Sequence, residues 1–156
     1  MMEPMTFDFD IRNDMRESAR EDLGRYRHAK KDIAHIELIL TQLREDAQKV
    51  THAMNEDRLP DLSDRNRTED AMVRFADKAI ELSEKQKDAE RICEEVKLKI
   101  GRLQNPQHRR ILLSHWIYGI ELQKIADAEE CSYSAIRGHH QTALEEYGKL
   151  FGAGWR

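Results

Sequence analysis

Two long stretches of this sequence carry apolar residues in alternating steps of three and four, a spacing that restricts a chain to long helices. The first stretch covers residues 14–56, and its apolar series is Tyr26, Ala29, Ile33, Ile36, Leu40, Leu43, Ala47, Val50 and Met54. The second ends near residue 104, with the series Met72, Phe75, Ala79, Leu82, Gln86, Ala89, Cys93, Val96, Ile100 and Leu103, in which Gln86 is the one polar residue. Each series, called a seam below, predicts one long helix.

A proline and several turn-forming residues separate the two seams. They fall at residues 59–64, and Thr68 follows as a suitable N-cap for the second helix. Two seams of equal length joined by a short loop predict an antiparallel helical hairpin, a coiled coil. Because the whole chain has only three prolines and seven glycines, little turn material remains elsewhere. The predicted fold class is all-α.

Further apolar residues lie beside the seams and widen the apolar face of the hairpin, namely Leu38, Ile39, Val73, Ile80 and Ile92. One seam does not bury both helices of a thin hairpin well. Two interpretations remain open. Either a second hairpin covers this face and forms a dimeric four-helix bundle, or the C-terminal part of the same chain packs on it.

The segment that follows Asn105-Pro106 is patterned as three short helices. The first carries a broad apolar stripe and ends at Gly119, the second is Leu122 to about Ala128, and Ser132 is a good N-cap for the third. The third helix should bury Ile136, Ala143, Leu144 and Tyr147. Two helices joined by so short a turn need a small residue where they cross, and Ala126 supplies it, with Ile125, Cys131 and Ile136 filling the wedge. This pattern indicates a helix-turn-helix, with a plain three-helix packing module as the alternative.

These residues resemble the region-four helix-turn-helix of bacterial sigma factors, which reads the promoter −35 element. The matching positions are Leu112, Leu113, Trp116, Gly119, Ile125, Ala126, Ser132, Ile136, Ala143 and Leu144. A helical N-terminal part before such a domain is similar to the ArpU/RinA class of phage transcriptional regulators. The sequence departs from the family at Glu129, where an apolar residue is usual, and at Glu130, where the turn usually has Gly.

The helix-turn-helix interpretation names the residues expected to contact DNA. On the outward face of the third helix these are Ser132, Tyr133, Ser134, Arg137, His140 and Gln141. We expect Arg137 to read a base edge and Arg109 and Arg110 to bind phosphates, with Lys124 as a further DNA contact. The chain as a whole has a net charge of −4, and its last third is nearly neutral. A monomer should therefore bind DNA weakly, and specific binding should need dimerisation or a larger complex.

No motif for catalysis is present, so we predict a protein that is not an enzyme and needs no cofactor. The sequence has no glycine-rich phosphate loop, no nucleophile elbow and no zinc-type Cys or His spacing. Asp32-x-x-His35 matches half of a carboxylate-bridged metal motif, but the second half is missing, so no metal site is expected. Cys93 and Cys131 occupy apolar positions, as reduced thiols of a cytoplasmic protein would. No apolar run approaches the roughly 20 residues of a membrane span.

The expected organisation is a flexible N-terminal tail (residues 1–13), the hairpin (14–104), the helix-turn-helix domain (105–150) and a C-terminal tail (151–156). Two functions of different class fit it. The first is a phage or prophage transcriptional regulator that binds double-stranded DNA, with a hairpin that forms a homo-oligomer or contacts RNA polymerase. The second is a helical adaptor, such as a small terminase-like DNA-packaging subunit. A DNA reader should expose Tyr133, Arg137 and Gln141 together, whereas an adaptor should bury some of them.

Overall fold

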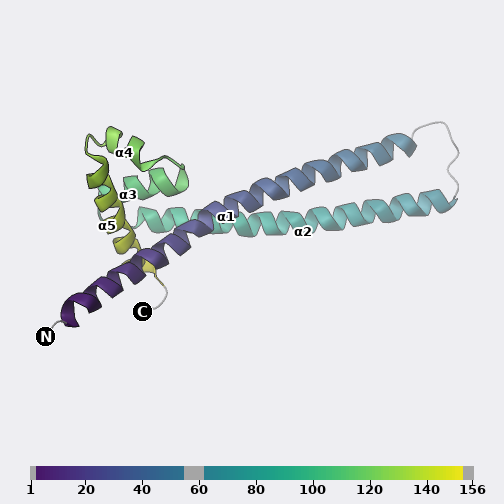
Figure 1. Cartoon of the computed structure of the whole chain (residues 1–156). Helices are drawn as coiled ribbons and strands as arrows, with labels where there is room; N and C mark the ends of the chain where they lie inside the picture. Colours follow the sequence, from purple (N-terminus) through teal and green to yellow (C-terminus); the bar gives the residue numbers. More distant parts are fainter. Residues whose placement is uncertain (1–2, 55–61, 153–156) are drawn as a thin grey trace. The chain divides into compact units, whose positions relative to one another are not determined.

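The computed structural model describes residues 3–54 and 62–152, and in these ranges every element of regular structure is a helix (Figure 1). The elements are α1 (Glu3–Met54), α2 (Leu62–Gly101), α3 (Pro106–Leu112), a π-helical turn η1 (Leu113–Ile117), α4 (Leu122–Ala128) and α5 (Tyr133–Phe151). The predicted all-α class is confirmed. None of the described helices combines the length and the apolar character that a bilayer span needs.

The helices begin earlier than the sequence indicated. Residues 3–13, expected as part of a flexible tail, belong to α1, and Thr68 lies inside α2 instead of capping its start. Both misplacements concern helix ends, which the apolar seams do not mark, because the seams begin only at Tyr26 and at Met72. The predicted loop residues 59–61 and the C-terminal residues 153–156 lie outside the described ranges.

The chain folds as two compact units, and the long helices α1 and α2 contribute to both. Unit 1 contains Met1–Ala29 and Ile92–Arg156, and unit 2 contains Lys30–Arg91. We had expected a division into residues 14–104 and 105–150. The observed division differs because the seam of α1 continues toward the N-terminus through Leu23, Ala19 and Met15. Leu23 and Ala19 are fully buried, and Met15 contacts α5.

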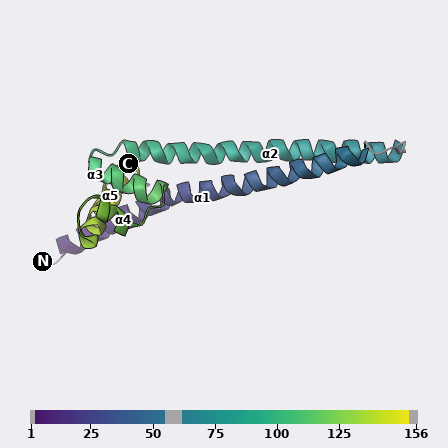
Figure 2. The ribbon, with the colours of Figure 1, turned by 90° about the horizontal axis from the view of Figure 1, so that it is seen from above.

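In unit 2, the second half of α1 and the first part of α2 lie side by side in opposite directions (Figures 1 and 2). The Gln86 amide donates to the Glu37 carboxylate across the pair, at 3.4 Å. Ile36, Leu82 and Ala89 are buried. Toward the loop the seam is only half-buried, and it lines a surface groove of about 270 Å³ between Leu40, Leu43, Arg44, Ala47, Phe75, Ala76, Ala79 and Ser83. The pair therefore has a seam but no enclosed core.

Unit 1 has a well-buried core drawn from α1, α2, α3, α4 and α5. Its fully buried large side chains are Leu23, Val96, Ile100, Leu103, Ile111, Leu112, Ile136, Leu144 and Tyr147. The carboxylate of Asp22 joins three of these helices, since it accepts from the Tyr147 hydroxyl at 2.5 Å and from Lys99 Nζ at 3.0 Å. Burial opposes ionisation of Asp22, yet the hydrogen bonds from Tyr147, Arg25 and Lys99 hold its pKa below the ordinary value.

α1 crosses α5 at very short range near the C-terminal end of α5. A Cβ atom placed on Gly148 would lie 2.0 Å from the carbonyl oxygen of Met15, so only glycine fits at this crossing. Beside the crossing, Arg16 pairs with Glu145 at 2.8 Å. Residues 15–29 of α1 thereby form one wall of the unit that contains the three C-terminal helices.

Candidate nucleic-acid interface

The start of α3 is held by its own cap and by a carboxylate of α5. The Asn105 side chain accepts from the Gln107 amide at 2.9 Å, and Pro106 occupies the first helical position, where its missing N–H costs nothing. Glu146 accepts from the Gln104 amide at 2.8 Å and also binds His108 Nδ1. The α2–α3 connection is thus fixed to α5.

α3 ends in a π-helical turn that brings Trp116 toward α5. The Tyr118 amide bonds to the Leu113 carbonyl five residues earlier, at 3.1 Å, and Gly119 then ends the helix with a φ of +69°. The Trp116 indole N–H donates to His140 Nε2 at 3.1 Å, and the two rings are stacked. A buried indole N–H needs such a partner, so this bond fixes Trp116 against α5.

The connection between α4 and α5 is a Schellman turn with a glutamate in the left-handed position. The Cys131 amide bonds to the Ala126 carbonyl at 3.0 Å, and the Glu130 amide bonds to the Asp127 carbonyl at 3.3 Å. Glu130 has a φ of +57°, a conformation that glycine adopts without strain. The turn keeps the geometry expected for a glycine, and the Cβ atom of Glu130 makes that backbone conformation strained.

The predicted wedge between α4 and α5 is confirmed. Ile111, Ile125, Ala126 and Ile136 form one buried cluster, and the half-buried Leu122 and Cys131 pack against it. Ala126 is fully buried, as a residue at a close helix crossing should be. The expected inward positions of α5, which are Ile136, Ala143, Leu144 and Tyr147, are all fully buried.

The N-terminal half of α5 presents polar side chains to solvent. Ser132 caps the helix by accepting from the Ala135 amide at 3.1 Å. Tyr133, Ser134 and Arg137 are exposed, and the Arg137 guanidinium lies 5.8 Å from the centre of the Tyr133 ring. Gln141, which was expected to be exposed with Tyr133 and Arg137, is half-buried instead, and Lys124 on α4 is exposed. Among the described carboxylates none pairs with Arg137 or Lys124, so both cations remain available.

His140 does not lie on the outward face, and its expected placement there was wrong. It is only 9% exposed, because position 140 shares the inward face of α5 with Ile136, Ala143 and Leu144. Burial, together with the nearby His115, Arg20 and Arg27, lowers the pKa of His140 to about 4. The neutral ring accepts from Trp116, so His140 acts in packing.

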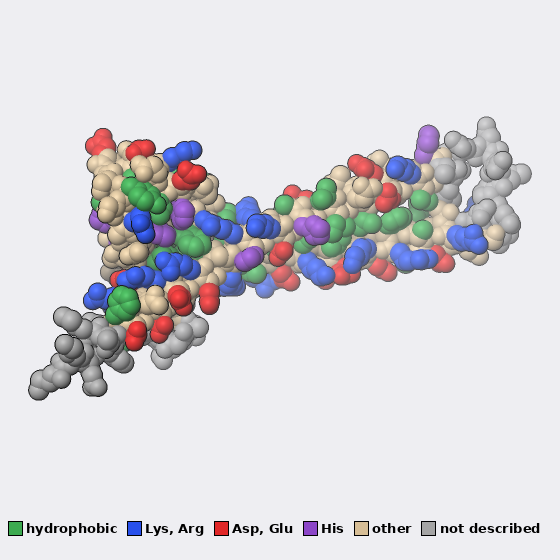
Figure 3. All heavy atoms as spheres, in the orientation of Figure 1, with side chains coloured by type: hydrophobic (Ala, Val, Ile, Leu, Met, Phe, Trp, Pro, Cys, Tyr) green, Lys and Arg blue, Asp and Glu red, His purple; other side chains and the backbone are tan. Residues whose placement is uncertain are grey.

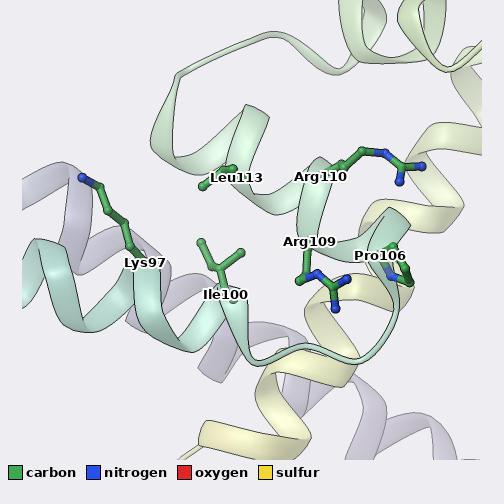
Figure 4. A pocket seen from close by; sticks show the side chains of 7 residues that line it. Lys97, Ile100, Pro106, Arg109, Arg110 and Leu113 are labelled. Carbon is green, nitrogen blue, oxygen red and sulfur yellow. The ribbon is translucent and has the colours of Figure 1, made fainter.

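The two expected phosphate contacts at the start of α3 have partners inside the chain. Arg109 donates to the carbonyls of Leu103 and Gln104, which closes the C-terminal end of α2. Arg110 forms a two-point ion pair with Glu129, at 2.8 Å and 3.2 Å, which holds the pKa of Glu129 below its ordinary value. Both arginines border a surface hollow of about 440 Å³, and Figure 4 shows Arg110 extending away from Ile100 and Leu113.

Sequence reasoning confined the candidate site to residues 105–150 and missed the part played by α1. The Arg27 guanidinium lies 4.5 Å from the centre of the Trp116 ring and donates to the His115 carbonyl at 3.1 Å. The spacing of Met15, Ala19 and Leu23 could have indicated this role of α1. These residues extend the seam of α1 beyond the length needed for the hairpin.

In the part of the chain that the structure describes, no group of three or more His, Cys, Asp and Glu side chains is placed to hold a metal ion. Comparisons with models of known protein families, with curated proteins and with solved structures find no match for this chain.

Proposed function

We propose that this chain is a DNA-binding transcriptional regulator in which α4 and α5 form a helix-turn-helix and α5 enters the major groove. The observation that carries the proposal is the division of α5 into two faces. One face is fully buried, whereas the other exposes Tyr133, Ser134 and the unpaired Arg137 near the helix N-terminus. In helix-turn-helix proteins, the N-terminal residues of the second helix contact the base edges.

The α4–α5 turn supports the resemblance to region four of sigma factors. Glu130 adopts the left-handed conformation that the family's usual glycine would take, so the substitution leaves the turn geometry in place. The same resemblance is the basis for proposing a phage or prophage regulator of the ArpU/RinA kind.

Unit 2 is proposed to form the homo-oligomer. Leu38, Val73 and Ile80 are each more than half exposed on its two helices. Two copies packed through such faces would make a four-helix bundle and place two α5 helices in one particle. Contact of this arm with RNA polymerase is the other role proposed for it.

A gel shift with duplex DNA from the chain's own genomic locus, at two salt concentrations, tests the proposal. We expect a locus duplex to bind more tightly than a random duplex of equal length, with weaker binding at the higher salt. Binding to neither duplex at the lower salt would contradict a DNA-binding function.

Arg137→Ala is the variant that tests the role of α5. If Arg137 reads a guanine edge, its loss should cost about 1–3 kcal/mol on the locus duplex and relax the preference at one base pair. Lys149→Ala removes one positive charge near the other end of α5 and serves as the control. Equal affinities for Arg137→Ala and the wild type would contradict the proposed readout.

A helical adaptor, such as a terminase-like packaging subunit, is the second candidate. The exposed apolar residues of unit 2 and the net charge of −4 favour it, because both suit a protein partner better than a nucleic acid. Stable assembly through unit 2 without any DNA binding in the gel shift would favour this function.

A further inference from the structure

The segment of α3, α4 and α5 lacks the free positive charge that a DNA-binding surface needs. Its basic residues are Arg109, Arg110, Lys124, Arg137 and Lys149, against the acidic residues Glu121, Asp127, Glu129, Glu130, Glu145 and Glu146. Arg109 and Arg110 are also held by partners within the chain. Because phosphate contacts supply most of the affinity of a protein for DNA, further cations must lie nearby if α5 enters a groove.

α1 carries such cations on one face. Arg16, Arg20 and Arg27 are separated by four and seven residues, so their side chains share one side of the helix. We call these three residues the arginine row. The exposed Asp14, Glu17 and Glu21 take a different face of the same helix. Figure 3 shows basic side chains following the first part of α1. The arginine row therefore lies apart from these three carboxylates.

Two contacts fix the arginine row beside α5. At one end, Arg16 binds Glu145 on α5 at 2.8 Å. At the other end, Arg27 packs its guanidinium over Trp116, whose indole N–H is bonded to His140 of α5. Arg20 lies between these two fixed points. The charges of Arg20 and Arg27 also contribute to the low pKa of His140, in agreement with their short distance from α5.

The arginine row continues the surface that contains Arg137. On α5, Arg137, Gln141 and Glu145 follow at intervals of four, so they occupy one side of the helix. α1 covers only the C-terminal end of this side, at Glu145 and Gly148. At the N-terminal end of this side, Arg137 is exposed.

We propose that Arg20 and Arg27 bind phosphates of the DNA backbone along one edge of the groove that α5 enters. This inference rests on the proposed function. Arg20 is exposed, and no described carboxylate pairs with it. Arg27 donates one N–H to the His115 carbonyl, and one face of its planar guanidinium packs on the Trp116 ring. Other N–H groups of its five remain for a phosphate. Arg16, which is bound to Glu145, positions α1.

The test measures the salt dependence of DNA binding by the full chain, with the locus duplex and a random duplex of equal length. Arg20→Ala should weaken binding to both duplexes by the same factor and lower the slope of log affinity against log salt by about one. Arg20→Ala combined with Arg27→Ala should lower that slope by about two. Arg74→Ala removes an exposed arginine of unit 2 and should leave the slope unchanged.

Arg20→Ala decides the outcome even if Arg27→Ala disturbs the packing of Trp116, because Arg20 forms no hydrogen bond or ion pair among the described residues. The Arg20→Ala variant could keep the wild-type slope of log affinity against log salt on DNA whose binding depends on Arg137. That result would overturn the proposed phosphate contacts of the arginine row and leave the proposed function intact. A wild type that binds neither duplex would overturn both. Equal losses in Arg20→Ala and Arg74→Ala would also overturn the inference, since they would show a general charge effect.

Discussion

The two units of this chain use the same helices, α1 and α2, in different ways. In unit 1 these helices share a core with α3, α4 and α5, and their seam residues are buried there, with Leu23 and Val96 at 0% exposure. In unit 2 they have only each other, and the seam residue Met72 is 40% exposed. The seam of unit 2 is buried at Ile36, Leu82 and Ala89 but becomes half-buried or exposed toward the loop. A regular seam therefore predicts a helix pair in both places without fixing how far the pair is enclosed.

The two units therefore suit different kinds of partner. The core of unit 1 is buried by helices of the same chain, so the exposed polar face of α5 is available for a ligand. Unit 2 leaves Leu38, Val73 and Ile80 exposed, and burying each such side chain is worth about 1.5–3 kcal/mol. A second copy of the unit would supply the missing cover.

The crossing of α1 and α5 is the place where unit 1 should be easiest to break. Gly148→Ala puts a Cβ 2.0 Å from the Met15 carbonyl oxygen, a backbone atom that cannot rotate away. We expect a loss of about 3 kcal/mol or more in the free energy of unfolding, measured by thermal or chemical denaturation. The control is Gly138→Ala on the same helix, where the new Cβ meets no atom within 4 Å and should stabilise by about 0.5–1 kcal/mol. Equal stabilities of the two variants would show that α1 does not pack on α5.

Substitutions in unit 2 separate its seam from its outer face. Leu82→Asp places a charge at a site that is 5% exposed and should cost about 2–3 kcal/mol, seen as loss of helicity in circular dichroism. Leu38→Asp, at a site that is 68% exposed, should leave helicity unchanged and reduce the sedimentation coefficient as the proposed oligomer dissociates. If Leu38→Asp lowers helicity as much as Leu82→Asp, the assignment of the two faces is wrong.

Acid should weaken unit 1 through His140. Its pKa is about 4 in the folded chain, below the ordinary value of 6.5, so the unfolded chain binds the proton more tightly. The stability due to the neutral ring is complete above pH 6.5 and is lost as the pH falls toward 4. Between pH 6.5 and 5 the loss should be roughly 2 kcal/mol, measured by denaturant titration. His140→Gln keeps an acceptor for Trp116 and should flatten this dependence. An unchanged pH profile in that variant would exclude His140 as the source.

The smallest effect is expected in the turn between α4 and α5. Glu130→Gly removes the strain of a left-handed glutamate and should stabilise unit 1 by about 1 kcal/mol, measured as a higher melting temperature. Glu130→Ala removes the charge but keeps the Cβ, so it should gain little stability. A larger gain from alanine than from glycine would show that charge, not backbone conformation, limits this turn.

The periodic positions of the fold could be predicted from the sequence. The wedge residues Ile125, Ala126 and Ile136 were found from spacing and size alone, because a close helix crossing allows few alternatives. The N-cap Ser132 was found from its side-chain chemistry. These features depend on residues that are close together in the sequence, so the sequence alone is enough to predict them.

Features that depend on distant parts of the chain were missed. His140 lies four residues from both Ile136 and Leu144, so its spacing already favours the inward face. Its polar side chain was placed outward because its partner, Trp116, is distant in the sequence. The partners of Arg109 and Arg110 are likewise set by tertiary contacts with Leu103 and Glu129. The role of Arg20 and Arg27 requires α1 to pack on α5, which no local pattern in residues 105–150 indicates.

The carboxylate of Asp22 has a consequence for how the chain reaches its folded state. It joins Lys99 and Tyr147, residues far from it and from each other in the sequence. Contacts between such distant positions form slowly, because a long loop must close before any of them stabilises the chain. During synthesis, the apolar side of α1 that packs on α5 therefore stays uncovered until α5, the last helix described, has been made. A fragment limited to residues 105–152 would in turn lack the Asp22 partner of Tyr147 and the α1 surface that covers Gly148.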